Sequence, residues 1–218
     1  MSVEKAFDRL LQMQWLAVPK SIYPYERIVE LADDVAGETD VAWLIRCHHT
    51  ANLPATAEQI SSAERLLGFR LPESLHRFYR LADGGKFFVV PAPWLQPEFP
   101  NAEHIRYHIF STAELVTFHQ QCMTTFRAML GEDPDFQHLH ALDYIAFCDA
   151  HNGNYLALLL EGPDQGKVFF LHREGLFRPY NAYEFDLYYI VADSLEDWLE
   201  RVIRTQGWDG FGEMMQTL

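Results

Sequence analysis

The chain has 218 residues, enough to bury a hydrophobic core as one domain, or as one domain with an added segment. With 49% hydrophobic and 22% charged residues, its composition is that of an ordinary globular protein and excludes wholesale disorder. The 17 lysines and arginines against 31 aspartates and glutamates give a net charge of −14, which disfavours nucleic acid and anionic membranes and favours basic partners.

The cellular compartment predicted from the sequence is the cytoplasm. The longest apolar run, residues 155–160, is far shorter than the roughly 20 residues that span a bilayer. The N-terminus carries acidic residues in an amphipathic pattern instead of the basic and apolar regions of a secretory signal. An odd number of scattered cysteines indicates a reducing compartment and no disulfide framework; they are Cys47, Cys122 and Cys148.

The first part of the chain is predicted to be a helical extension, residues 1–51, ahead of an α+β domain over residues 52–218. Apolar residues recur at helical spacing from Val3 to Leu11. A second helix is expected from about Tyr25 to Ala32, and a third from Thr39 to Ile45.

Two consecutive helices are predicted next. Thr56 and Gln59 form a capping box, and Gly68 supplies a left-handed stop to a helix whose apolar face includes Leu66. Pro72 suits the start of the second helix, which ends at the sequence Asp83-Gly84-Gly85.

Strands dominate the remainder of the chain. The predicted strands are residues 86–90, 105–109, 144–148, 155–160, 168–172 and 183–191, and further helices begin at Ser111 and near Ser194. The fold class is therefore α+β, with a single mainly antiparallel sheet flanked by helices.

The spacing of the two consecutive helices is similar to that of a known family. The run Leu67-Gly68, Leu71-Pro72, Phe78-Tyr79 and Asp83-Gly84-Gly85 resembles the opening signature of the SUKH superfamily. The turn at 153–155 and the helix beginning Ser194-Leu195-Glu196-Asp197-Trp198 resemble the rest of its pattern, over roughly residues 52–204. The superfamily includes fungal cell-wall-assembly regulators and many bacterial immunity proteins.

What the resemblance implies is a binding scaffold without an enzymatic centre or cofactor. Bacterial members neutralise a toxin by forming a tight complex with it, so we expect a cognate toxin as the protein partner. If that toxin is a nuclease, it is basic because it binds phosphate, and the acidity of this chain would speed encounter. The signature residues themselves have structural roles: core positions, a helix stop and a glycine turn.

Metal and catalytic sites are not supported by the residue spacing. His104 and His108 lie on a predicted strand, about 13 Å apart by its rise, too far for one ion. His48 and His49 are expected at a helix end. Cys122 and Cys148 fall on apolar positions that indicate core, not nucleophiles.

Candidate contact residues lie in two places. Interfaces favour exposed aromatic residues, which points to a proline-rich loop carrying Trp94 and Phe99. The second place is the polar face of the last predicted strand, with Glu184, Asp186 and Tyr188.

Three other functions stay open at this stage. A regulatory interaction protein without a toxin would have no toxin gene beside its own. An enzyme would hold carboxylic acids with raised pKa values in a deep pocket. A ligand sensor would enclose an apolar cavity with a few convergent polar groups.

Overall fold

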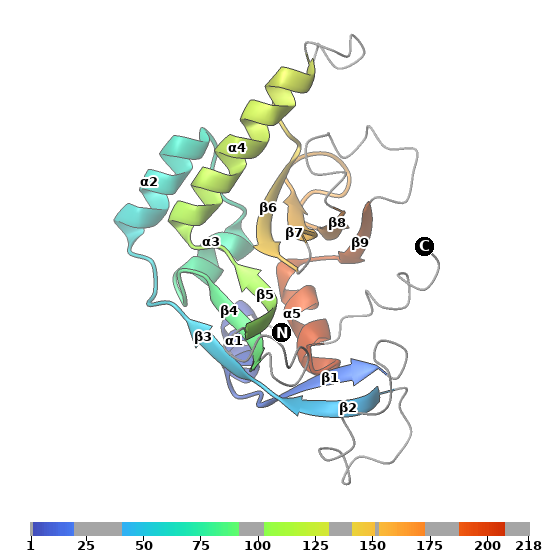
Figure 1. The fold of residues 1–218 in the computed structure, drawn as a ribbon. Helices are drawn as coiled ribbons and strands as arrows, with labels where there is room; N and C mark the ends of the chain where they lie inside the picture. The colour runs from blue at the N-terminus through green and yellow to red at the C-terminus, as the bar shows by residue number, and fades with distance from the viewer. Residues whose placement is uncertain are drawn as a thin grey trace.

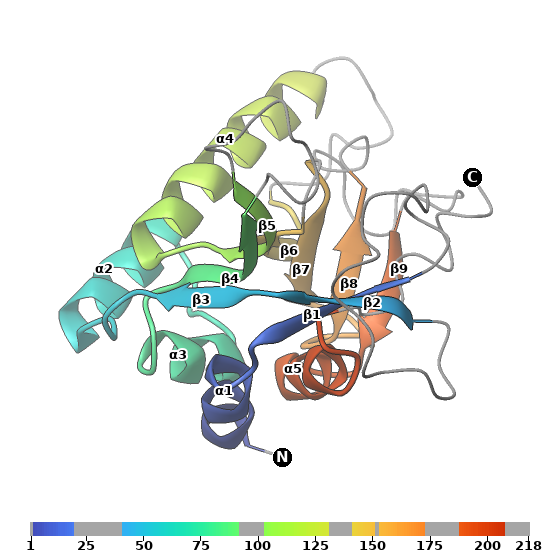
Figure 2. The same ribbon diagram turned by 60° about the horizontal axis from the view of Figure 1, so that its bottom comes forward.

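Seven strands form one antiparallel sheet in the computed structural model, which describes residues 2–19, 41–91, 103–130, 141–150, 153–172 and 188–207. The strand order is β3-β4-β5-β6-β7-β8-β9, and helices lie on both faces (Figure 1, Figure 2). The α+β class and the single, mainly antiparallel sheet are thus confirmed.

The helices are α1 (Val3–Leu11), α2 (Ala57–Leu67), α3 (Glu73–Tyr79), α4 (Thr112–Leu130) and α5 (Leu195–Arg204). The large sheet contains β3 (His48–Ala51), β4 (Gly85–Pro91), β5 (Glu103–Ile109), β6 (Tyr144–Asp149), β7 (Tyr155–Leu159), β8 (Val168–Leu171) and β9 (Tyr188–Ala192).

The strands β6, β7 and β8 are buried on both faces, which explains why their sequences are almost continuously apolar. One set of alternate residues packs under α4: Tyr144, Ala146, Ala157, Leu159, Phe169 and Leu171. The other set joins the core beneath α1, α3 and α5: Ile145, Phe147, Leu156, Leu158, Val168 and Phe170. Two layers of helices therefore enclose the centre of the sheet.

The first helix, predicted from the periodicity of residues 3–11, is confirmed as α1, and it joins the main core. The ring of Phe7 meets the rings of Phe78 and Phe87 edge to face, with centroids 5.4 Å and 6.1 Å away. Such aromatic pairs stabilise a core beyond the burial of their area. The domain boundary between residues 51 and 52 stays a prediction, although α1 shares its core with residues of the second range.

The prediction of a helix from Thr39 to Ile45 is wrong. Residues 41–46 form β2 (Val41–Arg46), which pairs antiparallel with β1 (Trp15–Pro19) in a separate two-stranded sheet. A short apolar run has no period that distinguishes strand from helix, and here the distant segment 15–19 supplies the pairing. His48 and His49, expected at a helix end, lie in β3. The helix expected near residues 25–32 lies outside the described residues.

The two consecutive helices are confirmed as α2 and α3. The reciprocal hydrogen bonds of Thr56 and Gln59 close the capping box, and Gly68 ends α2 with a φ of 84°. One detail is wrong: Leu66, predicted on the apolar face, is 59% exposed.

The sequence Asp83-Gly84-Gly85 is the junction where α3, β3, β4 and the start of α4 meet. Both glycines have positive φ values, 75° and 145°. A Cβ on Gly84 would lie 2.5 Å from the carbonyl oxygen of Ile109, and one on Gly85 would collide with the carbonyl oxygen of Thr50. The neighbouring backbone therefore leaves no room for a side chain at either position, and the positive φ values disfavour one as well.

Replacing Gly85 with alanine tests this close approach. We expect Gly85→Ala to lower the free energy of unfolding by about 3 kcal/mol or more, because the β3–β4 pairing must open. Gly68→Ala is the matched control, since its φ is 84° but nothing lies within 4 Å of an added Cβ. That change should cost only about 1 kcal/mol in urea unfolding, from the left-handed conformation alone. Equal losses in the two variants would contradict the account.

The imidazole of His49 lies at a β-bulge in the pairing of β3 with β4. His49 stands opposite two residues of β4, and Phe88 there has a φ of 52°. The backbone N–H of Phe88 donates to Nδ1 of His49 (3.2 Å), and Nε2 donates to the carbonyl oxygen of Met13 (2.9 Å). Both ring nitrogens are thus used by the neutral imidazole. Burial, with a smaller contribution from the charge of His48, holds the pKa of His49 below the ordinary value of 6.5 despite the bond to Met13.

Stability should therefore fall in mild acid. Burial also lowers the pKa of His119, whose side chain is buried in α4. The folded chain binds these two protons less readily than the unfolded chain does. Their contribution to stability is complete above about pH 6.5 and is lost as the pH falls through the folded-state pKa values. We expect the urea midpoint to drop between about pH 7 and about pH 5, and His119→Leu to make that drop shallower. A midpoint that rises over this range would contradict the prediction.

Candidate partner-binding surface

The helix α5 divides cleanly into a buried face and a charged face. Ser194 caps its first turn by accepting a hydrogen bond from the backbone of Asp197 (3.1 Å). The buried face consists of Leu195, Trp198, Leu199, Val202 and Ile203. The opposite face carries Asp197, Glu200, Arg201 and Arg204, at the three- and four-residue spacing of one helix surface.

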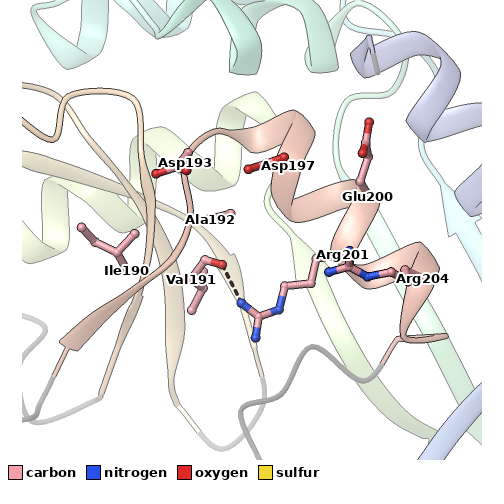
Figure 3. A pocket seen from close by; sticks show the side chains of 8 residues that line it. All are labelled: Ile190, Val191, Ala192, Asp193, Asp197, Glu200, Arg201 and Arg204. Carbon is pink, nitrogen blue, oxygen red and sulfur yellow. Dashed lines mark hydrogen bonds between the residues drawn. The ribbon is translucent and has the colours of Figure 1, made fainter.

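This charged face of α5 and the last strand β9 enclose a groove of about 400 Å³ (Figure 3). We call it the β9–α5 groove; its residues are Ile190, Val191, Ala192, Asp193, Asp197, Glu200, Arg201 and Arg204. Ile190 is 38% exposed, one of the few large apolar side chains on the described surface. The groove lies at the edge of the sheet, because β9 is its last strand.

Charge is distributed unevenly along the β9–α5 groove. Asp193 and Asp197 lie at the N-terminal end of α5, Glu200 lies near its middle, and the two arginines lie toward its C-terminal end (Figure 3). The side chain of Asp193 is 80% exposed. The ammonium group of Lys167 lies 2.8 Å from the carboxylate of Asp164 and 3.7 Å from that of Asp193. One end of the groove is thus suited to a cationic side chain.

The strand edge beside the groove is irregular, and an arginine occupies it. The pairing of β8 with β9 runs from Val168 opposite Ala192 to Phe169 opposite Ile190, so Val191 is an extra residue. The guanidinium of Arg201 donates to the carbonyl oxygen of Val191 (2.8 Å; Figure 3). A bulge and a charged side chain are how proteins protect an edge strand from adding further strands. The groove is therefore better suited to side-chain recognition than to strand addition.

The predicted contact residues fall almost entirely outside the described part of the chain. Trp94, Phe99, Glu184 and Asp186 are outside it, and Tyr188 is known only as the first residue of β9. Their role stays a prediction. The groove begins two residues after Tyr188, so the acidic strand and the groove are neighbours in sequence.

The charged face of α5 was missed by the sequence reasoning, although a signal for it was present. The prediction of the terminal helix used only its apolar positions. The intervening residues, 197, 200, 201 and 204, form a complementary charged stripe at the same helical period.

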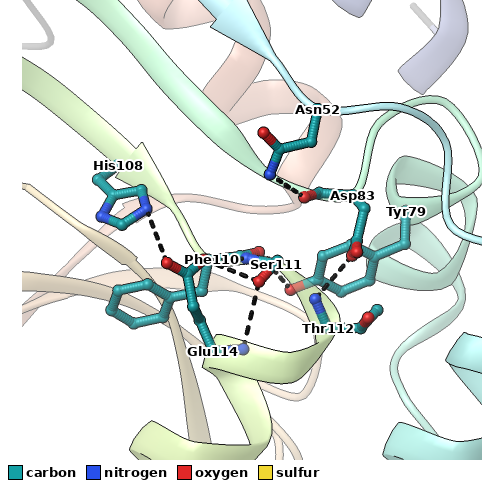
Figure 4. A network of polar contacts seen from close by, with 8 residues as sticks. All are labelled: Asn52, Tyr79, Asp83, His108, Phe110, Ser111, Thr112 and Glu114. Carbon is teal, nitrogen blue, oxygen red and sulfur yellow. Dashed lines mark hydrogen bonds and ion pairs between the residues drawn. The ribbon is translucent and has the colours of Figure 1, made fainter.

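A second polar cluster surrounds the Asp83-Gly84-Gly85 junction, and its contacts are structural (Figure 4). Oδ1 of Asp83 accepts from the backbone N–H of Thr112 (2.7 Å) and so caps the start of α4 from outside the helix. The side chain of Asn52, in the segment between β3 and α2, donates to the carbonyl oxygen of Asp83 (2.7 Å) and so fixes the position of this segment. The hydroxyl of Tyr79 donates to the carbonyl oxygen of Phe110 (3.1 Å).

The carboxylate of Glu114 in this cluster is held ionised. Ser111 and Glu114 form the predicted capping box, with hydrogen bonds of 2.8 Å and 3.2 Å between side chains and backbone. Burial by itself raises the pKa of Glu114, but the hydrogen bonds from Ser111 and the nearby His108, 3.4 Å away, outweigh it and lower the pKa. A carboxylic acid in an active site usually needs the opposite shift. These contacts assign Glu114 the role of a helix cap.

The three cysteines are buried in the core. Cys47, Cys122 and Cys148 are 6%, 2% and 0% exposed. Burial raises the pKa of both Cys47 and Cys122 to about 12, far from the range of a reactive thiolate. Within the described ranges, no three histidine, cysteine or acidic side chains come together in a way that could hold a metal ion. In the same ranges, no helix is long and apolar enough to cross a membrane.

Together these features define an α+β domain whose signature residues build the fold and whose last strand and helix carry a charged groove. The model of the SMI1 / KNR4 family (SUKH-1) matches residues 54–201, well over half of the 218-residue chain. The chain belongs to this family, which confirms the predicted resemblance. A search of curated proteins found no match to it.

Thiol accessibility checks the core assignment. A disulfide reagent such as Ellman's should react with none of the three cysteines in the native chain over minutes, and with all three in urea. The reason is that each cysteine is buried, and that burial raises the pKa of Cys47 and Cys122. A thiol that reacts rapidly in the native chain would contradict the placement of that cysteine in the core.

Proposed function

We propose that this chain is an immunity protein, which binds a cognate toxin and neutralises it without catalysis. Membership of the SMI1 / KNR4 family (SUKH-1) is compatible with an immunity or regulatory role. The observation that carries the choice of a basic toxin is the acidic end of the β9–α5 groove on a chain of net charge −14. An acidic surface of this kind accelerates encounter with a basic partner and disfavours acidic ones.

We propose that the toxin contacts this chain at the β9–α5 groove. A lysine or arginine of the toxin would lie near Asp193 and Asp197, which both line the acidic end of the groove. The exposed side chain of Ile190 supplies an adjacent apolar contact. Trp94, Phe99, Glu184, Asp186 and Tyr188 are proposed to extend the same interface. No cofactor or metal takes part in this mode of action.

Non-enzymatic action is supported by the state of the described polar groups. Asp83 and Glu114 cap helix α4, and burial raises the pKa of Cys47 and Cys122 to about 12, far above the range of a reactive thiolate. A regulatory protein that binds a partner other than a toxin is the second candidate, and the same family match favours it. The neighbouring gene separates the two, because an immunity gene adjoins the gene of its toxin.

The first experiment expresses the chain with the product of the adjacent reading frame. We expect a one-to-one complex that survives purification at moderate salt, and rescue of cell growth when the product is toxic. Failure of the chain to bind or protect against a toxic neighbour would overturn the immunity assignment and leave the regulatory one.

Charge reversal then tests the groove. Asp193→Lys with Asp197→Lys should slow association with the toxin by roughly tenfold and weaken its dependence on salt, because the steering field is reversed there. The matched pair is Asp197→Lys alone as the groove variant and Glu58→Lys as the control, each a single charge reversal, since Glu58 is also an exposed acid in the first turn of a helix, on α2. Equal association rates for the groove variant and the control, measured by stopped flow, would exclude the groove as the contact.

A further inference from the structure

The C-terminal end of the β9–α5 groove carries two arginines, to which the contact with a basic toxin side chain assigns no role. Arg201 and Arg204 are three residues apart and so share one face of α5, and both line the groove (Figure 3). Arg201 is half-buried and Arg204 is exposed. The acids at the other end of the groove account for the binding of a cation, but not for a pair of cations beside them.

Arg201 is held in place by the irregular strand edge. One N–H of its guanidinium donates to the carbonyl oxygen of Val191 (2.8 Å), which is the extra residue of β9. A guanidinium has five N–H donors, and this is the only hydrogen bond that the side chain of Arg201 makes to the described residues. The remaining donors can therefore bind another group, on a side chain that has already lost conformational entropy to its bond with Val191.

No carboxylate in the described ranges forms an ion pair with either arginine. By contrast, Arg77 and Lys167 each lie within 3.9 Å of two carboxylates. The carboxylate of Glu200, next to Arg201 in sequence, points away from both guanidinium groups (Figure 3). Like charges three or four residues apart on a helix repel each other. An anion supplied from outside the chain would relieve this repulsion.

The helix dipole favours a basic residue in the last turn of α5, but it does not account for two unpaired arginines. The helices α1, α2 and α4 each carry one basic residue in the last turn: Arg9, Arg65 and Arg127. In α3, the arginine of the last turn is paired with acids. The second arginine of α5 therefore points to a ligand, because both arginines line the same groove.

The chemistry of the pair selects a carboxylate as the group that a protein partner would supply. A guanidinium is planar and can bind a carboxylate through two parallel hydrogen bonds. Asp197 and Arg204 are seven residues apart, which is about 10 Å along the axis of α5. A segment bound in the groove would therefore carry a basic side chain and a carboxylate about 10 Å apart. The reverse order would bring like charges together, which excludes wrong partners.

We propose that Arg201 and Arg204 form an anion site that binds a carboxylate of the toxin, at the opposite end of the groove from Asp193 and Asp197. The source of the carboxylate rests on the proposed function, whereas anion binding by the two arginines does not. The site makes the groove selective for two opposite charges in one order. A basic toxin still approaches a chain of net charge −14 favourably, because the carboxylate is recognised only at close range.

Titration of the purified full chain with inorganic phosphate tests the anion site without any partner. Phosphate is the probe because arginine binds its oxygens with the same paired hydrogen bonds. We expect the side-chain Nε–Hε NMR signals of Arg201 and Arg204 to shift saturably. The signal of Arg127, an exposed arginine in the last turn of α4, should not shift in this way. Sodium chloride at equal ionic strength is the control for screening.

Two variants complete the titration. Arg204→Gln should weaken phosphate binding by roughly tenfold, because one of the two charged donors is lost, and Arg127→Gln should leave it unchanged. A titration without saturable shifts at Arg201 and Arg204, or with an equal saturable shift at Arg127, would overturn the anion site.

The complex with the product of the adjacent reading frame tests the source of the anion. Arg204→Glu should raise the dissociation rate by roughly tenfold or more, because two carboxylates would then face each other. Arg127→Glu is the matched control, since it reverses the charge of another exposed arginine in the last turn of a helix. Equal dissociation rates for the two variants would overturn the carboxylate contact and leave the immunity assignment intact. A wild-type chain that binds no product would instead overturn the proposed function, and the phosphate titration would still decide whether the arginines bind an anion.

Discussion

The close approach of backbones at Asp83-Gly84-Gly85 is the constraint on which the remainder of the structure depends. Within three residues the chain leaves α3, passes the carbonyl groups of Thr50 and Ile109, and enters β4. Any side chain at the two glycines would push Gly85 away from β3, or Gly84 away from the end of β5. The carboxylate of Asp83 then caps α4. One short sequence thereby fixes two strands and two helices in relation to each other.

This constraint explains why the family signature identifies the fold without marking a site. Asp83 of the signature caps α4, and Leu71, Phe78 and Tyr79 are buried in the core. The proposed binding surface lies away from the Asp83-Gly84-Gly85 junction, on the outer face of α5. The β9–α5 groove lies at the opposite end of the sheet from β3, where the charged face of α5 is not required for packing.

Local chemistry made most of the fold predictable. Capping boxes at Thr56 and Ser111, and the stop at Gly68, depend on residues close in sequence, and all three are confirmed. The β1–β2 pair could not be predicted in this way, because each strand is defined by a partner some thirty residues away. The groove was missed for a related reason: the charged face of α5 becomes one wall of a groove only when β9 packs beside it. The predicted contact residues at 94, 99, 184 and 186 stay predictions.

Hydrogen exchange of the chain, alone and with the product of the neighbouring gene, tests the central claim most directly. The account predicts slower exchange on binding for amides of β9 and the N-terminal half of α5. It also predicts little change around Asp83 and Thr112, which are occupied by structural contacts in the free chain. Slower exchange confined to the junction around residues 79–85, with β9 and α5 unaffected, would contradict it. The binding surface would then lie in the signature itself.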